Sequence, residues 1–558
     1  MLMVFRDNAI FQGEDEAMGA LPETPSSRLT THIIVLVLPL LTAKDKIVRF
    51  RSTQIVAHLI NTLDSIDDEL FQPIRMGLLR RLRDKESNVR VQAVYGLGRL
   101  ASEGDMNDDD DDDSEDDSPA GGVLAKLLDV LQNDPSADVR RSLLLNLPFT
   151  PATLPYLLER ARDSDAAIRR ALYSRLLPAL GDFRHLSLTH REKLLRWGLR
   201  DRDETVKKAT ARLFRERWIE NCAQTHDEGG NAIELPAGQI AEPSLQGLLE
   251  LLERIDVVNA GIEGGIALDA MKEFWHGRPD YCEHMTFDEA YWKDLSAESA
   301  FVARTFNDFC REESASDSLK EKMPEVTRFA FLLQQNINTM TEAVRRAALN
   351  QEEDSVQEEF IVEQLLHIGL TLDYSDEVGR RTMFSLMREA LAIPDLPEES
   401  TRLVVEVLRT ACGANIAAEK EFSAVILEAI AEVHDTVMGE EPSKLGEEDS
   451  FHSARSEVSG GSTPRAAKSK AISDEDDEDK AIQEIMINMK CLHIAQCMLQ
   501  NVDCNLEQNA HLVTMLNNLV IPAVRSQEAP IRERGLLCLG LCCLLDKVSL
   551  GQRLRALP

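Results

Sequence analysis

Basic side chains recur at fixed places along the first 220 residues of the chain, and their chemistry suits phosphate groups. They accompany a repeated signature: an Asp, four further residues, then Val or Ile directly followed by Arg or Lys. The copies are Asp84–Val89–Arg90, Asp134–Val139–Arg140, Asp163–Ile168–Arg169 and Asp201–Val206–Lys207, with a weaker copy at Val48–Arg49. Lys and Arg neutralise nucleic-acid phosphates, so a recurring set of them predicts an electrostatic binding surface.

The position of each base relative to the signature separates two groups. Arg49, Arg90, Arg140, Arg169 and Lys207 directly follow the repeat Val or Ile. For this group we favour pairing with the signature Asp of a neighbouring repeat. A second group lies in turns or on adjacent helix faces, where a stripe of phosphate contacts and ordinary solvated charge are equally good interpretations of any one residue. This candidate DNA-binding set is Lys44, Lys46, Arg51, Arg80, Arg81, Arg83, Lys85, Arg141, Arg170, Arg200, Arg202, Lys208 and Arg212.

The distribution of charge matters more here than its sum. The net charge of −34 alone would argue against nucleic-acid binding. Residues 41–100, however, hold eleven basic and seven acidic residues, and residues 123–220 hold nineteen and thirteen. Local potential decides where a phosphate backbone binds. No aromatic residues interleave with these bases in the way that single-strand binding needs, so we expect contacts to duplex phosphates that are sequence-independent and salt-sensitive.

Paired helices must position these bases. In each signature the apolar residues recur four and eight places after the Val or Ile, which puts them on one helix face. The signature Asp stands where it could cap that helix. The spacing is 41 residues from Val48 to Val89 and 38 from Ile168 to Val206, enough for two helices and their turns. A lone pair cannot bury its apolar face, so the pattern predicts an all-α, HEAT-repeat solenoid of stacked antiparallel pairs.

Residues for other chemistry are present without the spacing that this chemistry needs. The ten cysteines form no C-x-x-C pair, and most sit in apolar helical patterns, as buried thiols of a reducing compartment do. We find no phosphate-binding loop, nucleophile elbow or H-E-x-x-H motif. The apolar run at 33–41 contains Pro39 and is too short for a membrane span. We therefore expect no enzyme activity, metal, cofactor, small-molecule substrate or membrane partner.

Three stretches interrupt the helical pattern and set the predicted organisation. Residues 102–118 hold eleven acidic residues and no basic ones, which predicts disorder, either as a solubilising linker or as a competitor for the basic face. Thr463 and Ser473, in a second predicted linker, stand in kinase-like motifs and are weak phosphorylation candidates. The predicted segments are a poorly patterned 1–27, repeats at 28–101, an acidic insert at 102–122, repeats at 123–438 with a divergent aromatic-rich part at 245–312, a disordered linker at 439–480, and further repeats at 481–558 that look truncated.

Five stretches resemble condensin subunit 3, the G-type HEAT-repeat subunit of condensin. They are AKDKIVRFRSTQIVAHLINTLDSIDDEL (43–70), LLRRLRDKESNVRVQAVYGLGRL (78–100), DVRRSLLLNLP (138–148), IDVVNAGIEGGIALDAMKEFWHGRPDY (255–281) and LSAESAFVARTFNDFC (295–310). The last two are specific, since an unrelated HEAT protein has no reason to share them. The resemblance extends over roughly 30–558 and is of a fungal type. Family members usually have further helices at both ends, so we expect an incomplete chain.

The resemblance implies a curved clamp that binds the kleisin subunit of condensin in its groove and, with it, double-stranded DNA. The SMC ATPase pair, reached through the kleisin, hydrolyses ATP in its place. The implied process is mitotic chromosome condensation, in the nucleus and on chromosomes with a cytoplasmic pool. The alternative is a HEAT scaffold that binds only proteins, like a transport receptor or a phosphatase scaffold. That alternative would need no basic stripe and would leave the motifs at 255–281 and 295–310 unexplained.

Overall fold

The structure is a computed structural model that describes residues 25–63, 68–103, 122–223, 242–313, 321–350, 353–413, 415–438 and 473–545. Predictions that concern 1–24, most of the acidic insert, 439–472 with Thr463, and 546–558 lie outside these residues. The described residues form helices and turns and contain no strand. They divide into two compact units, Met1–Asp256 with Glu263–Glu283 and Val257–Ile262 with His284–Pro558.

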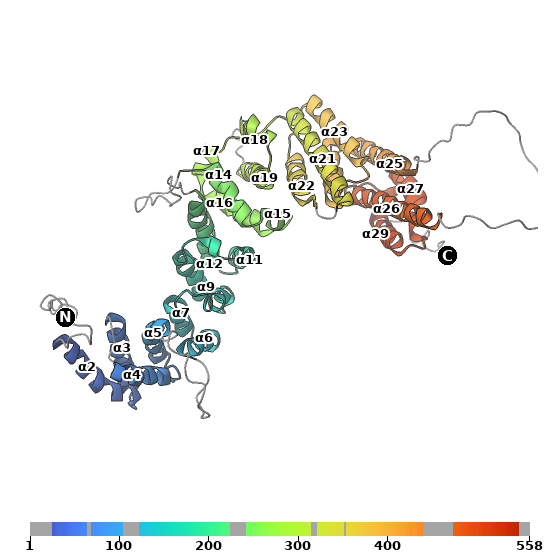
Figure 1. The fold of residues 1–558 in the computed structure, drawn as a ribbon. Helices are drawn as coiled ribbons and strands as arrows, with labels where there is room; N and C mark the ends of the chain where they lie inside the picture. The colour runs from blue at the N-terminus through green and yellow to red at the C-terminus, as the bar shows by residue number, and fades with distance from the viewer. Residues whose placement is uncertain are drawn as a thin grey trace, which may run out of the picture. The chain divides into compact units, whose positions relative to one another are not determined.

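The first unit is a succession of helix pairs (Figure 1). In each pair the second helix carries the signature, and these second helices, α3, α5, α7, α9 and α12, each pack on the next. Their partners across the pair include α4, α6 and α11. The elements are α2 (Pro25–Val37), η1 (Leu38–Thr42), α3 (Lys46–Thr62), α4 (Asp68–Arg81), α5 (Ser87–Glu103), α6 (Val123–Asn133), α7 (Ala137–Asn146), α8 (Leu154–Leu158), η2 (Glu159–Arg162), α9 (Ala166–Ala171), η3 (Leu172–Leu176), α10 (Leu177–Ala179), η4 (Phe183–His185), α11 (Leu188–Leu199), α12 (Glu204–Arg212), η5 (Leu213–Trp218), α13 (Ile219–Ala223), α14 (Leu245–Arg254), α16 (Ile266–Gly277) and α17 (Pro279–His284).

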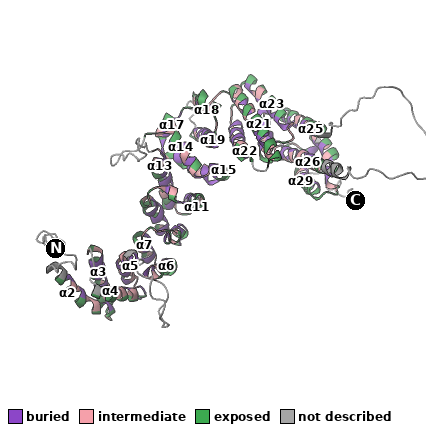
Figure 2. Cartoon of the chain, in the orientation of Figure 1, coloured by how far each residue is buried: buried purple, intermediate pink, exposed green. Residues whose placement is uncertain are grey.

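The signature residues build this stack as the apolar spacing predicts. Val89, Val139, Ile168 and Val206 are all fully buried, together with the apolar residues that follow them on the same face. Figure 2 shows that buried positions recur along the succession of helices rather than gathering at one centre. Each helix therefore buries its apolar face against its neighbours in the stack. The structure is a HEAT-repeat α-solenoid, as the sequence predicts.

Two signature helices of the first unit widen into a π-helical turn. The turn η3 follows α9, and η5 follows α12, so each continues a signature helix without a break. Pro178 lies two residues after η3 and has no N–H to bond to the carbonyl four residues back. Single π-helical turns of this kind often mark functional places in helices.

The second unit is also built of packed helices. Its elements are α15 (Val257–Ala260), α18 (Glu289–Lys293), α19 (Ala297–Glu312), α21 (Val326–Leu349), α22 (Val356–Gly369), α23 (Glu377–Leu391), α24 (Glu398–Cys412), α25 (Ile416–Met438), α26 (Ser473–Gln500), η6 (Leu506–Gln508), α27 (Ala510–Met515), η7 (Leu516–Val520), α28 (Ile521–Val524) and α29 (Ala529–Leu545). The helix α26 begins at Ser473, within the segment 439–480 that the sequence pattern predicts as a linker.

The aromatic-rich segment at 245–312 is divided between the units. Phe274, Trp275 and Tyr281 are buried in the first unit, where Phe274 meets both other rings edge to face. Phe287 and Phe306 are buried in the second unit with ring centroids 5.1 Å apart. These buried rings therefore pack inside the two units.

The two most specific sequence motifs have structural roles. In HGRPDY, Arg278 binds both carboxylate oxygens of Asp280, donates to the carbonyl of Arg215 and lies 4.5 Å from the Tyr281 ring centroid. In LSAESAFVARTFNDFC, Ser296 forms a capping box with Ser299 at the start of α19. Both motifs thus specify backbone turns that a simple repeat lacks.

Candidate nucleic-acid interface

Four bidentate ion pairs connect successive signature helices of the first unit. Each arginine after the repeat Val or Ile donates from Nε and Nη2 to both carboxylate oxygens of the next signature Asp, at 2.6–3.2 Å. Its Nη1 donates to a backbone carbonyl six residues before it, at 2.6–3.0 Å. The carboxylate also accepts the amide two residues after it. We call these pairs the ladder: Arg49–Asp84, Arg90–Asp134, Arg140–Asp163 and Arg169–Asp201.

The ladder changes the role expected for the signature Asp. That Asp does not cap the following helix through its side chain, as its position first suggested. Two of the four helices have a side-chain cap two residues later, where Asp165 accepts the amides of Ala167 and Ile168, and Asp203 accepts that of Thr205. The side chain of the signature Asp instead binds the ladder arginine and a backbone amide of the turn.

Three of the ladder carboxylates, Asp84, Asp163 and Asp201, have lowered pKa values. Burial alone would raise the pKa of Asp163, but the hydrogen bonds from Arg140 and from the Asp165 amide outweigh it and hold the pKa below its ordinary value. The same causes lower the pKa of Asp84 beside Arg49 and of Asp201 beside Arg169. The three arginines have raised pKa values because of the same hydrogen bonds. The charge of a ladder arginine is thus already paired with its Asp and is not available to bind a phosphate.

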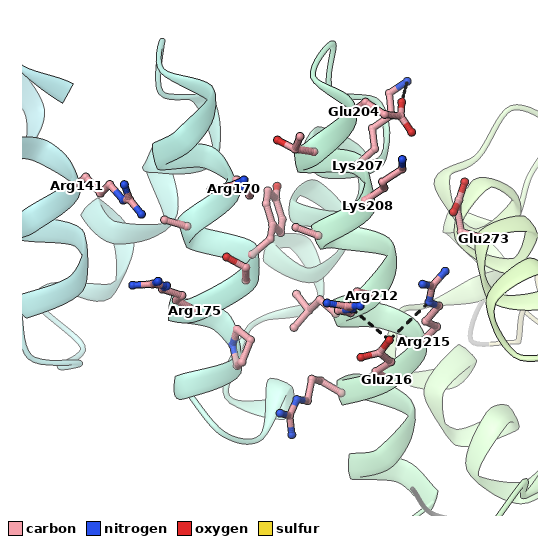
Figure 3. Close-up of a pocket in the computed structure, with 18 residues that line it drawn as sticks. Arg141, Arg170, Arg175, Glu204, Lys207, Lys208, Arg212, Arg215, Glu216 and Glu273 are labelled. Atoms are coloured by element: carbon pink, nitrogen blue, oxygen red, sulfur yellow. Dashed lines mark ion pairs between the residues drawn. The ribbon is translucent and has the colours of Figure 1, made fainter. Parts of the chain in front are cut away.

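The second predicted group contributes four residues to an open cleft of about 910 Å³ on the stacked signature helices. Figure 3 shows Arg141 on α7, Arg170 on α9, and Lys208 and Arg212 on α12 around it. The remaining basic residues of its lining are Arg175, Lys207, Arg215 and Arg217, and its acidic residues are Glu204, Glu216 and Glu273. We call this site the basic cleft. Eight cations against three carboxylates leave it strongly positive inside an acidic chain.

Half of the cations in the basic cleft have no ion pair. Among the residues that the structure describes, Arg141, Arg170, Arg175 and Lys208 have no carboxylate within ion-pair distance. The Nε of Arg141 is buried without a hydrogen-bond partner there. Arg212 and Arg215 share Glu216, at 3.3 and 4.0 Å. Donors held in one place without acceptors are what an anionic ligand needs.

Lys207 departs from the ladder. It follows Val206 as the ladder arginines follow theirs, but its Nζ lies 3.7 Å from the exposed Glu204 and it lines the basic cleft. A lysine has no planar fork to bind an Asp from two nitrogens, so the ladder ends at Arg169 among these signature copies.

The other predicted bases lie along the turns between paired helices. Arg81 is largely buried and binds Asp84 at 2.7 Å, so it supports the ladder. Arg80, Arg83 and Lys85 are exposed around the turn from α4 to α5. Before and on α3, Lys44 is exposed, Lys46 lies 3.9 Å from Glu86, and Arg51 donates to Gln54.

Arg200 and Arg202 line a smaller cleft of about 450 Å³ at the turn from α11 to α12. Arg200 binds Asp269 at 2.7 Å, whereas Arg202 is exposed. This cleft also holds Trp197 with Arg162 over its ring, an aromatic–cation pair that the expectation of no interleaved aromatics overlooked.

The sequence analysis did not identify Arg175, Arg215 and Arg217 as candidate binding residues, and it predicted that Lys207 pairs with a signature Asp. All three of these arginines lie within π-helical turns, Arg175 in η3 and Arg215 and Arg217 in η5. A π-helical turn changes the phase of the helix, and therefore α-helical spacing could not assign their side.

No group of three His, Cys, Asp or Glu side chains among the described residues could hold a metal ion. None of the described helices combines the length and apolar character that crossing a bilayer requires.

Comparison with known proteins gives one consistent family. Residues 490–557 match the family model described as "Nuclear condensing complex subunits, C-term domain". Condensin complex subunit 3 of Schizosaccharomyces pombe is 37% identical over 94% of this chain and 55% of its own length. That of Saccharomyces cerevisiae is 30% identical over 93% of this chain and 50% of its own.

A solved structure agrees with these relatives. The crystal structure of the S. pombe condensin Cnd3-Cnd2 subcomplex matches with a TM-score of 0.70 and 36% identity, over 93% of this chain and 59% of the matched one. The chain thus spans about half the length of the curated relatives it matches. These matches agree with the motifs at 255–281 and 295–310, and the chain belongs to the condensin complex subunit 3 family.

Proposed function

We propose that this chain is a non-catalytic condensin HEAT subunit that binds double-stranded DNA through the basic cleft. One observation carries the DNA assignment: four unpaired cations, Arg141, Arg170, Arg175 and Lys208, face one cleft from three successive repeats. Surface cations normally pair with nearby carboxylates or stand alone in water. A set without partners, aligned along stacked helices, matches a row of phosphates instead.

The form of the cleft favours backbone contact over base recognition. Its lining contains one aromatic residue, Tyr173, which is fully buried and donates its hydroxyl to the carbonyl of Leu194. No ring is therefore free to stack on a base, and long flexible cations reach phosphates of any sequence. Binding is then independent of sequence and falls steeply with salt.

Partners and location follow from family membership. The chain binds the kleisin subunit, and through it the SMC ATPase pair, which hydrolyses ATP. Support comes from the matched structure, whose subject is a Cnd3-Cnd2 subcomplex. We place the chain in the nucleus and on chromosomes, with a cytoplasmic pool, during mitotic chromosome condensation. A scaffold that binds only proteins remains the second candidate, but it gives the unpaired cations no role.

Charge reversal in the full chain tests the DNA proposal. Arg175→Glu, Lys208→Glu and Arg212→Glu together remove three cations of the cleft. We expect the affinity for a short duplex, followed by fluorescence anisotropy, to fall at least about tenfold, and the slope of log K against log salt to become shallower by about three. The matched control reverses Lys293, Arg388 and Lys420, three exposed cations of the second unit without described ion pairs.

Equal losses in the two triple variants would reject the cleft as the DNA site. A third variant, Arg80→Glu, Arg83→Glu and Lys85→Glu, asks whether the DNA path extends to the predicted bases of the α4–α5 turn. Arg81 is left unchanged in this variant, since it supports the ladder. Pull-down with a kleisin fragment tests the protein partner separately, and loss of DNA binding with kleisin capture intact would locate the two sites apart.

A further inference from the structure

The smaller cleft of the first unit has a different chemistry from the basic cleft. It lies at the turns beside the ladder and is lined by Arg162, Arg196, Trp197, Arg200 and Arg202, with the ladder residues Asp163, Arg169 and Asp201. We call it the Arg–Trp cleft. Its cations are all arginines, whose planar forks bind carboxylates from two nitrogens.

Every acceptor in the Arg–Trp cleft is already occupied. Asp163 and Asp201 are held by Arg140 and Arg169 and by backbone amides. Two donors remain open. Within the described part of the chain, Arg162 and Arg202 have no carboxylate within ion-pair distance, and both are exposed. A ligand of this cleft must therefore bring acceptors and negative charge.

The aromatic residue gives the cleft an apolar component. Trp197 is half-buried, and the guanidinium of Arg162 lies 5.7 Å from its ring centroid. Its indole N–H has no acceptor among the described residues. A cation stacked on an indole is held in position, so Arg162 loses little freedom when it binds an anion.

We propose that the Arg–Trp cleft binds a short acidic peptide segment of a partner protein, with carboxylates on Arg162 and Arg202 and an apolar side chain against Trp197. Arginine clusters are a recurrent means of recognising acidic motifs. A single nucleic-acid strand fits less well, since binding along a strand uses a succession of aromatic platforms and this cleft has one. The proposal depends on the first unit alone and not on DNA binding.

The tryptophans provide a specific readout. The chain has four, and Trp218, Trp275 and Trp292 are no more than 3% exposed. Acrylamide quenching of the intrinsic fluorescence of the full chain therefore reports mainly on Trp197. The probe is the hexapeptide EDLDEE, titrated at low salt, with the charge-reversed peptide KRLKRK as control. We expect EDLDEE to protect Trp197 from acrylamide and KRLKRK to have no effect.

Substitutions separate binding from folding. Arg162→Gln with Arg202→Gln should weaken EDLDEE binding at least about tenfold, because two charge-assisted contacts are lost. Trp197→Phe keeps a ring in place and should abolish the quenching signal while a labelled peptide still binds. The basic-cleft variant Arg175→Glu, Lys208→Glu, Arg212→Glu should bind the peptide as the unchanged protein does.

Four results would overturn the proposal. The first is peptide affinity unaffected by Arg162→Gln with Arg202→Gln. The second is failure of EDLDEE to protect Trp197. The third is a single-stranded oligonucleotide that protects Trp197 at lower concentration than the peptide, which would assign the cleft to nucleic acid. Equal loss of peptide binding in the basic-cleft variant would likewise show that general charge, and not this cleft, is responsible.

Discussion

Arg140 and Arg141 are neighbours in the chain but belong to different regions of the first unit. Arg140 is buried in the ladder, with both oxygens of Asp163 and the carbonyl of Asp134 as its partners. Arg141 lines the basic cleft without an ion pair among the described residues. Arg169 and Arg170 divide in the same way. One residue turns the side chain by about 100° around a helix, so adjacent arginines serve the fold and the surface separately.

The largest expected effect separates these neighbours by stability. Arg140→Ala removes both charge-assisted hydrogen bonds of the ladder from the buried Asp163 and leaves it the longer contact with Arg160, at 3.4 Å, and the Asp165 amide. We expect the free energy of unfolding to fall by about 3 kcal/mol. Arg141→Ala should change it by less than about 0.5 kcal/mol, as surface substitutions usually do. Urea unfolding of both variants, with hydrogen exchange in α7 and α9, measures the difference. Similar losses would show that the ladder is not what distinguishes the two arginines.

The second effect comes from the shape of the guanidinium. Arg140→Lys keeps the positive charge but cannot donate to both oxygens of Asp163 and to the Asp134 carbonyl together. We expect about half the loss caused by Arg140→Ala, as roughly 1–2 kcal/mol from the missing charge-assisted bonds. The control is Arg141→Lys, which should leave stability unchanged. A fully stable Arg140→Lys variant would mean that charge alone maintains the ladder.

The third effect is the response of the ladder to acid. The folded pKa of Asp163 lies below its unfolded value, so its stabilisation is complete above the ordinary pKa of about 3.9 and is lost as pH falls through the lowered folded value. Asp163→Asn removes this titration. The difference in unfolding free energy between the unchanged chain and Asp163→Asn should therefore shrink as pH falls below about 4. A difference that stays constant from pH 6 to pH 3 would contradict the lowered pKa.

The sequence predicts the stack well and the surface less well, for a physical reason. Burial of Val89, Val139, Ile168 and Val206 follows from apolar periodicity, since a helix pair must hide that face. The ladder partners could also be predicted, because each signature supplies an Asp for the arginine of the preceding signature. The α-helical period of 3.6 residues could not predict the helix face of Arg175 or Arg217, because both lie in π-helical turns.

The Arg–Trp cleft shows a second limit of sequence reasoning. Arg162 and Trp197 are 35 positions apart and meet only because the η2–α9 and α11–α12 turns lie beside each other in the stack. A search for aromatics next to bases in the sequence does not detect such a pair. The division of the aromatic-rich segment between two units depends on contacts just as distant, and no local pattern announces it.

The smallest expected effect concerns Lys207, which has the ladder position but lines the basic cleft. Its one described carboxylate contact is the exposed Glu204, so Lys207→Ala should cost less than about 0.5 kcal/mol in stability. If Lys207 contacts a phosphate, the same change should make the salt slope of duplex binding shallower by about one, as should Lys208→Ala. Unfolding and anisotropy measurements on both variants provide the comparison. A stability loss like that of Arg140→Ala would show that Lys207 acts as a ladder residue. An unchanged salt slope would show that Lys207 does not contact DNA. The two measurements thus separate the position of Lys207 in the repeat from the direction of its side chain.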